Sequence, residues 1–379
     1  MLTYGYPPPN FKLKSDKKKV RNSNLELYRI IVMILIVAHH YVVNSGLMAI
    51  LQESPLTPSS SAMLFFGAWG KTGIDCFLFI TGYFMSKSDI TWEKFLKLYL
   101  QIIFYAVVIY AIFYITGQES LSPKALLKLW PMKSFTQNFT GCFIMFYLFI
   151  PFINVLIRHI NKNQHLILII LLLVFYSILP TIPKFNMDFN YVSWFMGIYV
   201  MAAYVRFYRF FPSISHKKWG IITLILILFG AFSIIGMETI YKKGYIPMWA
   251  PYFFVADSNK LLPILIAVSS FMYFKDLKIP HSRLINAIGG ATFGVLLIHS
   301  NSDTMRQWLW RDTVDCIGHF GGDLIWVLTY AILSVLIIFV VCAGIDWFRG
   351  IFIEPYYLNF IIRHTTSIKN KILQAIRRI

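Results

Sequence analysis

Three side chains capable of acid–base chemistry or anion binding are grouped in one apolar segment, NLELYRIIVMILIVAHHYVVN, which covers residues 24–44. On a helix, Arg29 and His40 lie roughly 16 Å apart along the axis and only about 20° apart around it. Glu26 lies about 40° from His40 on the same face. A carboxylate, a guanidinium and an imidazole are therefore predicted to share one stripe of a helix within a hydrophobic run.

His40 is the side chain on this stripe that is best suited to proton transfer, because the reference pKa of imidazole is near neutrality. An imidazole in hydrocarbon costs a few kcal/mol unless it has a partner or faces a wet cavity, so it indicates a functional site by default. The alternative is a hydrogen bond that only joins two helices. His39 points about 100° away from His40. We assign the structural role to His39 and the functional role to His40.

A second group of candidate residues lies in the segment AWGKTGIDCFLFITGYFM and just beyond it. Lys71 and Asp75 are four residues apart on one helical face, so they can form an ion pair that either belongs to a site or only orients the helix. Gly82 permits the close approach of another helix or of a ligand. Lys87 leads a basic cluster that suits the phosphates of an anionic donor and equally suits membrane topology.

His299, in the segment ATFGVLLIHS, is a further imidazole in an apolar run and a secondary candidate. A hydrogen bond to a polar helix is the leading interpretation, and a direct catalytic role is the alternative. No metal site or disulfide is expected, because Cys76, Cys142, Cys316 and Cys342 are dispersed and lack the spacing of zinc ligands. The sequence also lacks the serine-hydrolase elbow, the HExxH helix and the phosphate-binding loop.

These residues are embedded in a strongly hydrophobic chain. Of its 379 residues, 57% are hydrophobic and only 14% are charged, and the mean hydropathy is +0.62. Soluble domains have about 25% charged residues, so the composition predicts a polytopic membrane protein. The net charge of +18 does not indicate a nucleic-acid partner, because the basic residues of membrane proteins gather in cytoplasmic segments near anionic membrane lipids.

Ten apolar segments are predicted to be transmembrane helices of an all-α protein with both termini on one side. They cover residues 27–46, 62–86, 95–116, 139–158, 165–180, 189–208, 219–237, 260–275, 286–305 and 322–346. With the N-terminus inside, 25 of the 35 Lys and Arg residues fall on the cytoplasmic side and nine on the other, which predicts cytoplasmic termini. Residues 1–23 are expected to be a disordered basic tail, residues 24–350 the transmembrane domain, and residues 351–379 a second basic tail.

The two segments with the first candidates resemble the start of acyltransferase family 3, whose members are integral-membrane O-acyltransferases that modify bacterial polysaccharides and lipid-linked glycans. In RNSNLELYRIIVMILIVAHHY, Arg29 and His40 match the family's basic residue that is followed by ten residues and a histidine. FLFITGYF matches the motif of its second span, with Thr81 in place of the usual serine. His299 falls at the histidine of a later family segment. The lysines after the second span depart from the arginines of many members.

The resemblance implies an O-acyltransferase, most simply an O-acetyltransferase, of a bacterial inner (plasma) membrane, with acetyl-CoA or another acyl-CoA as its cytoplasmic donor. The acceptor would be a hydroxyl of a surface polysaccharide or of its lipid-linked precursor. His40 would act as general base or as covalent acyl carrier, with Arg29 near a CoA phosphate or the thioester and Glu26 orienting Arg29. Two alternatives remain: a transporter or flippase of a lipid-linked saccharide, and a non-enzymatic partner of a glycan-assembly complex.

Overall fold

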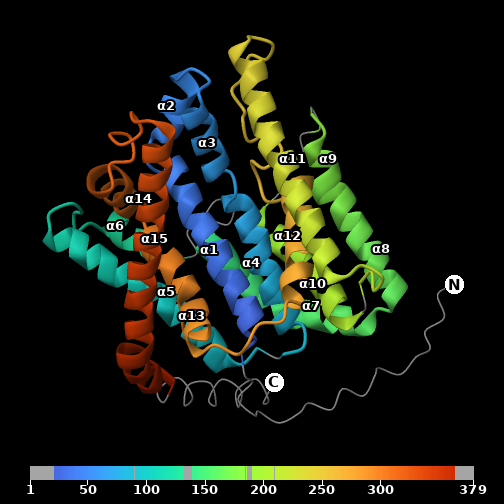
Figure 1. Ribbon diagram of the computed structural model, residues 1–379. Coiled ribbons are helices and arrows are strands. Elements are labelled where there is room, and N and C mark those ends of the chain that lie inside the picture. The colour runs from blue at the N-terminus through green and yellow to red at the C-terminus, as the bar shows by residue number, and fades with distance from the viewer. Residues whose placement is uncertain are drawn as a thin grey trace.

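The computed structural model describes residues 21–88, 90–131, 139–183, 185, 190–208 and 210–362, and every regular element in these ranges is helical (Figure 1). The long helices are α1 (Ser23–Val43), α4 (Gly70–Met85), α5 (Trp92–Ile115), α7 (Phe139–His159), α8 (Lys162–Leu173), α10 (Tyr191–Phe207), α11 (His216–Lys242), α12 (Leu261–Lys275), α13 (Arg283–His299) and α15 (Leu324–Phe348). The short elements are α2 (Leu47–Glu53), α3 (Pro58–Gly67), α6 (Pro123–Lys128), η1 (Val174–Ile178), α9 (Leu179–Thr181), α14 (Asp303–Gln307), η2 (Trp308–Thr313) and η3 (Arg349–Ile353).

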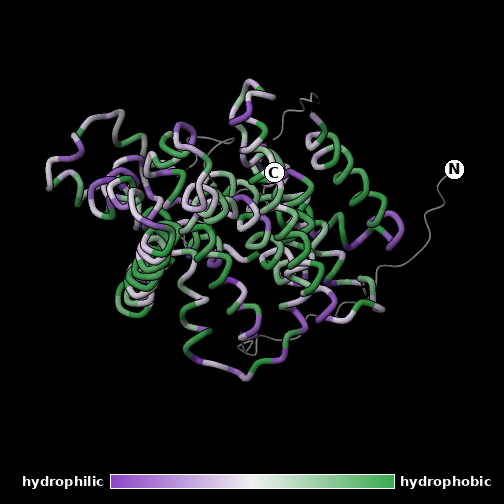
Figure 2. The backbone as a smooth tube through the Cα atoms, turned by 45° about the horizontal axis from the view of Figure 1, so that its top comes forward, coloured by the Kyte–Doolittle hydropathy of each residue, from purple (hydrophilic) through white to green (hydrophobic). Residues whose placement is uncertain are grey.

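The prediction of an all-α, multi-pass architecture is confirmed. In the described ranges, seven helical stretches are long and apolar enough to cross a membrane, and α13 with α14 and η2 makes an eighth if a bent pair counts as one span. Helices α10 and α12, of 17 and 15 residues, are shorter. Each of the ten predicted segments therefore contains a helix, while length and composition alone support seven or eight spans. In Figure 2, hydrophobic residues run along the helices and hydrophilic residues gather toward the connections.

Helix α1 packs against α3, α4, α13 and α15, so it has neighbours on several sides. Glycines permit its close approach to α3, since a Cβ at Gly67 would lie only 2.6 Å from the Cβ of Val42. Gly82 has the same role between α4 and α10, where a Cβ would lie 2.9 Å from that of Ala202. Small residues let helix backbones approach closely, and van der Waals packing is a main attraction between helices in lipid.

Helix α13 ends at His299, and the chain bends by 98° before it continues in α14 and η2. The hydroxyl of Ser300 donates to the carbonyl of Leu296 at 2.8 Å. The side chain of Ser302 caps α14 by accepting a hydrogen bond from the backbone N–H of Met305 at 3.1 Å. Non-helical backbone inside a membrane protein is tolerated where it is buried in protein or lines a cavity. Ser300, Asn301 and Ser302, which form this break, line a cavity.

A buried polar cluster joins α5, α15 and η3. Asp346 accepts hydrogen bonds from the hydroxyl of Tyr105 at 2.8 Å and from Nε of Arg349 at 2.9 Å. Arg349 also donates to Glu354 at 2.7 Å, and Glu354 forms an ion pair with Lys97 at 2.5 Å. The charges in the cluster compensate one another, which offsets part of the cost of burying them.

The start of α1 and the end of α15 lie at the same end of the bundle (Figure 1). Helical structure continues past residue 351 as far as residue 362, and Glu354 contacts Arg349, so the first part of the expected C-terminal tail packs on the bundle. The remaining tail residues, 1–20 and 363–379, lie outside the described part of the chain.

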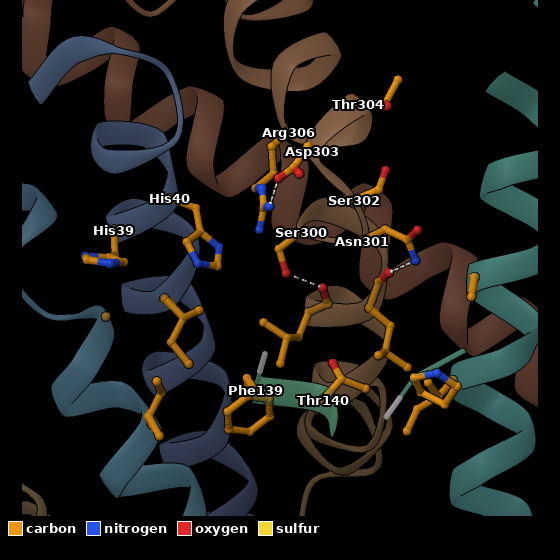
Figure 3. Close-up of a pocket in the computed structure, with 18 of the residues that line it drawn as sticks. His39, His40, Phe139, Thr140, Ser300, Asn301, Ser302, Asp303, Thr304 and Arg306 are labelled. Atoms are coloured by element: carbon orange, nitrogen blue, oxygen red, sulfur yellow. Dashed lines mark hydrogen bonds and ion pairs between the residues drawn. The ribbon is translucent and has the colours of Figure 1, made fainter. Parts of the chain in front are cut away.

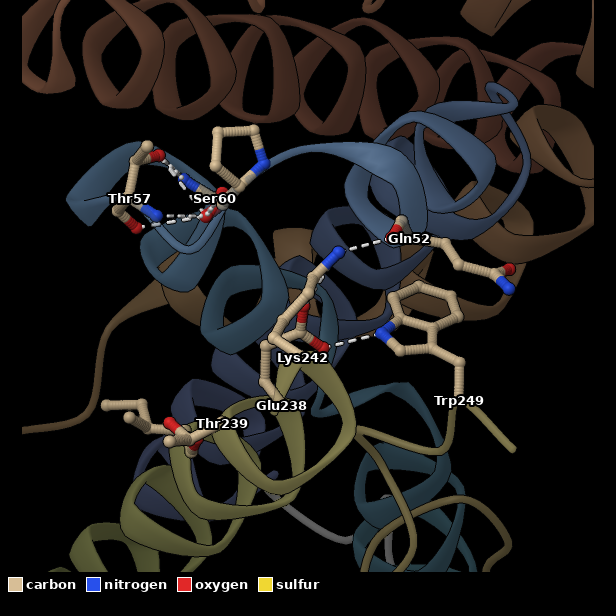
Figure 4. A network of polar contacts seen from close by, with 9 residues as sticks. Gln52, Thr57, Ser60, Glu238, Thr239, Lys242 and Trp249 are labelled. Atoms are coloured by element: carbon tan, nitrogen blue, oxygen red, sulfur yellow. Dashed lines mark hydrogen bonds and ion pairs between the residues drawn. The ribbon is translucent and has the colours of Figure 1, made fainter. Parts of the chain in front are cut away.

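A polar network fastens α11 to α2 at the other end of the bundle (Figure 4). Glu238 accepts a hydrogen bond from the indole of Trp249 at 2.5 Å and lies 3.6 Å from the ammonium of Lys242. Lys242 also donates to the backbone carbonyl of Gln52. Because Glu238 is buried, these partners replace the water that its carboxylate has lost.

Candidate active site

His40 and His299 meet at the interface of α1 and α13. The Nδ1 atom of His40 lies 2.8 Å from Nε2 of His299, and Nδ1 of His299 lies 2.6 Å from the carbonyl oxygen of Val295. His299 is fully buried, whereas His40 is partly exposed and lines a cavity. The two imidazoles therefore form a pair in which His299 is buried and His40 faces the cavity.

The carbonyl of Val295 fixes the positions of the protons in this pair. A carbonyl oxygen only accepts hydrogen bonds, so Nδ1 of His299 carries a proton and, in the neutral ring, Nε2 is the acceptor. The contact with His40 then requires Nδ1–H of His40 to be the donor. A neutral His40 is left with an unprotonated Nε2, which is the state required of a general base.

The cavity beside His40 has a volume of about 540 Å³ and lies between α1, α4, α5 and α13 (Figure 3). Toward the start of α1 its lining is apolar and includes Met33, Ile36, Phe77 and Ile102. Toward the end of α1 its lining is polar and includes Glu119, Ser300, Asn301, Ser302, Asp303, Thr304 and Arg306. This volume is in the range of small-molecule sites, and the polar mouth provides groups that can orient a ligand.

Arg306 points into the cavity beside His40 and Ser300 (Figure 3), and it forms an ion pair with Asp303. The 98° bend after α13 brings this guanidinium back to the cavity. A cation next to an imidazole base suits a reaction in which negative charge develops on oxygen. Sequence reasoning gave Arg306 no role. The signal that could have identified it is the polar run SNSDTMR directly after His299.

Lys71 lines the cavity together with His40, whereas Asp75 does not. Lys71 donates to the hydroxyl of Tyr191 at 2.6 Å, and the fully buried Asp75 accepts from the indole of Trp194 at 3.1 Å. In the described structure the expected Lys71–Asp75 ion pair is therefore replaced by two separate contacts from α4 to α10. Lys71 is a second cation that faces the cavity, and Asp75 helps to hold α4 against α10.

On the face of α1 where the sequence placed Glu26, Arg29 and His40, Glu26 and His40 both contact α13. Glu26 packs on Gly289 near the start of α13, where a Cβ would lie 2.5 Å from its carboxylate. Arg29 donates to Glu26 at 3.2 Å. Neither Glu26 nor Arg29 lines the cavity, whose wall on α1 begins at Met33. The structure thus brings His40 and His299 together. It places the Glu26–Arg29 pair outside the cavity, nearer the start of α1.

His39 and Lys87 lie on other sides of the bundle. Nδ1 of His39 donates to the carbonyl of Gly67 at 2.5 Å, so this ring joins α1 to α3, although it also borders the cavity. Lys87 follows the end of α4 that is remote from His40, and its ammonium lies 5.5 Å from the ring centroid of Phe207. Burial, and then the charge of Arg206, lower the pKa of Lys87. Lys87 does not border the cavity.

All four cysteines are free and buried. Within the ranges that the structure describes, no group of three His, Cys, Asp or Glu side chains is placed to hold a metal ion. A family model described as an acyltransferase domain, that of acyltransferase family 3, matches residues 22–351. Searches of curated proteins and of solved structures gave no significant match. The family match includes every helix that builds the cavity and both imidazoles of the pair.

Proposed function

Since this chain belongs to acyltransferase family 3, we propose that it is a membrane O-acetyltransferase. It would transfer acetyl from acetyl-CoA to a hydroxyl group of a surface polysaccharide or of its lipid-linked precursor. Family membership gives the class of reaction, which is acyl transfer. The observation that carries the proposal is the contact of Nδ1 of His40 with His299, which leaves Nε2 of His40 available as a base in the wall of a ligand-sized cavity.

In this proposal His40 is the general base. Its Nε2 takes the proton of the acceptor hydroxyl while the hydroxyl oxygen attacks the thioester carbonyl carbon. The tetrahedral intermediate collapses with cleavage of the C–S bond, and the departing thiolate receives the proton from His40. Nδ1–H of His40 donates to His299 in both charge states, so the ring keeps its orientation while positive charge forms on it.

The same Nε2 could instead carry the acyl group on a covalent intermediate. Transfer from acylated His40 would then need another base beside the acceptor hydroxyl. The candidate bases are the two carboxylates at the cavity mouth, and each already has a partner. Glu119 accepts a hydrogen bond from the hydroxyl of Thr304, and Asp303 forms an ion pair with Arg306. We therefore favour direct transfer with His40 as base.

We assign the stabilisation of the oxyanion to Arg306 and Lys71, which line the cavity together with His40. Each cation is held by a partner, Arg306 by Asp303 and Lys71 by the hydroxyl of Tyr191. Preorganised positive charge near a developing oxyanion is usually the largest single contribution to catalysis of this kind.

The charge distribution supports entry of the acceptor from the outer side of the membrane. The start of α1 and the end of α15 lie at one end of the bundle (Figure 1), and the excess of Lys and Arg predicts that this end is cytoplasmic. The polar mouth of the cavity includes Glu119 and Arg306, and it lies toward the other end of α1. A cytoplasmic donor and an outer acceptor would then meet at His40.

The test compares cells that carry His40→Ala with cells that carry His159→Ala, in which an exposed histidine at the end of α7 is removed. In the His40 variant we expect the O-acetyl content of the surface polysaccharide, measured by NMR, to fall about 100-fold. Protein level and polymer amount should stay unchanged. Normal acetylation in this variant would refute the role of His40, and loss of the polymer itself would indicate a transporter or flippase.

A further inference from the structure

A second and mostly apolar cavity lies between α5 and α15. Its volume is about 690 Å³, and its lining includes Val108, Ile112, Gly344 and Phe348. Ile112 and Phe348 are 53% and 52% exposed, which places them on the outer surface of the bundle. In a chain that spans a membrane such a surface faces hydrocarbon. This space, termed the α5–α15 groove, therefore opens toward lipid.

The two ends of the α5–α15 groove differ from its apolar middle. At one end, its lining includes Tyr105 and Arg349, both of which are bonded to the buried Asp346 at 2.8 and 2.9 Å. At the other end, roughly 16 Å further along α5, its lining includes Thr116 and Gln118. The apolar middle fits a hydrocarbon chain, and the uncharged polar end fits the start of a head group.

The polar end of the α5–α15 groove shares its rim with the cavity beside His40. Phe113 lines both spaces. Gln118 lines the groove, and the next residue, Glu119, lines the cavity. Across the rim, Met305 lines the groove and Arg306 lines the cavity. Consecutive residues thus line the two spaces in turn, so the groove and the cavity adjoin at Phe113.

We propose that the α5–α15 groove binds the hydrocarbon chain of a lipid-linked saccharide, whose head group turns over Phe113 into the cavity beside His40. The inference rests on the proposed acetyltransferase function and specifies its acceptor as lipid-linked. A chain held in the groove raises the effective concentration of its own hydroxyl groups at His40. An ordinary membrane lipid has no saccharide to place among the polar groups of the cavity mouth, so the shared rim favours a molecule with both parts.

Gly344 lines the groove at a point where a side chain can be added. A Cβ at Gly344 would meet no heavy atom within 4 Å, so the first atom of the Gly344→Phe side chain has room and its ring adds volume to the groove that Gly344 lines. Gly236 in α11 provides the matched control, because a Cβ there also meets nothing within 4 Å and the residue lines neither space. Both substitutions replace a helical glycine by phenylalanine, so their effects on helix propensity are alike.

The experiment uses the full-length protein in membrane vesicles with radiolabelled acetyl-CoA and two acceptor preparations. One is an organic extract of the host's membranes that contains its lipid-linked saccharides, and the other is the same extract after mild acid has released the saccharides from lipid. We expect the unmodified protein to label the first at least about tenfold faster than the second. Gly344→Phe should lower the rate on the first at least about tenfold and leave the second unchanged. Gly236→Phe should behave as the unmodified protein.

Equal rates on the two preparations, or equal rates for Gly344→Phe and Gly236→Phe on the lipid-linked one, would overturn the groove proposal. Absence of transfer by the unmodified protein to either preparation would overturn both this proposal and the proposed function. Transfer that persists in His40→Ala would count against the role of His40 alone, and the Gly344 comparison would still decide the groove.

Discussion

The Nδ1 atom of His40 lies 2.8 Å from Nε2 of His299, and this contact joins α1 to α13 across 259 positions of sequence. The carbonyl of Val295, 2.6 Å from Nδ1 of His299, makes His299 the acceptor in that contact. His299 is buried and is separated from the cavity by His40, so any effect on the reaction passes through the His40 ring. In the proposed mechanism it is a positioning residue that selects the tautomer of the base.

His299→Ala should lower kcat by about 100-fold and leave KM for acetyl-CoA nearly unchanged, because His40 loses the acceptor that fixes its ring. His299→Gln should recover part of kcat, since its side-chain oxygen can accept a hydrogen bond from Nδ1–H of His40. Steady-state kinetics in membrane vesicles measures both constants. His319→Ala is the control, because His319 lies in the connection before α15 and does not line the cavity. Equal losses in the Ala and Gln variants would mean that His299 only fills space.

Helical spacing correctly placed Glu26 and His40 on one face of α1. Glu26 and His40 both contact α13, and His39, about 100° away, contacts Gly67 on another side. The apolar runs predicted the helices, because a membrane-spanning segment must satisfy its backbone hydrogen bonds internally. Helical spacing did not predict which positions along α1 reach the cavity. Arg29 lies one helical turn before Met33, the first residue of α1 that lines the cavity.

Long-range contacts could not be predicted from the sequence alone. Arg306 reaches the cavity because the chain bends by 98° after α13, and no local pattern specifies the direction of that bend. Asp346 lies near the end of an apolar run, and its partners Gln101 and Tyr105 are 245 and 241 positions away. The α5–α15 groove likewise depends on how two helices far apart in the sequence are placed.

Arg306→Ala should lower kcat by about 100-fold, because it removes a cation from the position where the oxyanion is proposed to form. Arg306→Lys should retain more activity, since it keeps the charge and loses the planar fork of donors. Initial rates at saturating donor and acceptor measure the difference. Arg311→Ala is the matched control, because Arg311 lies in η2 and does not line the cavity. Equal rates for Arg306→Ala and Arg311→Ala would contradict the assignment.

Arg29→Ala should lower the free energy of unfolding by roughly 3 kcal/mol, because the carboxylate of Glu26 is buried and loses its partner at 3.2 Å. Arg21, 3.5 Å from the same carboxylate, compensates only in part. The double variant Glu26→Gln with Arg29→Gln removes both charges and should recover most of the stability. Unfolding by denaturant in a mild detergent measures the three proteins.

The same double variant separates two roles of Arg29. If Arg29 only pairs with Glu26, KM for acetyl-CoA should return to that of the unmodified protein once stability is restored. We expect this result, because Arg29 does not line the cavity. A KM that stays about tenfold higher in the stable double variant would instead place Arg29 in contact with the donor.

Asp346→Ala should lower the free energy of unfolding by roughly 3 kcal/mol, because it leaves the buried guanidinium of Arg349 with less compensating charge. It also removes the acceptor for Gln101 and Tyr105, which donate to Asp346 at 3.0 and 2.8 Å. Asp276→Ala is the control, because Asp276 pairs with Lys275 at 2.6 Å while its side chain is 51% exposed. Exposed pairs contribute only about 0–1 kcal/mol, so this variant should unfold nearly as the unmodified protein does.

The loss of stability expected for Asp346→Ala is large because the buried Arg349 is left with too little negative charge beside it. Arg349 keeps Glu354 at 2.7 Å, but Glu354 also pairs with Lys97, so its single charge would then face two cations. The double variant Asp346→Leu with Arg349→Leu removes one charge of each sign and should recover most of the stability, since a buried ion pair is often replaced by apolar residues at little cost. Denaturant unfolding in detergent measures this recovery. A double variant as unstable as Asp346→Ala would show that the cluster acts through its geometry and not through the balance of its charges.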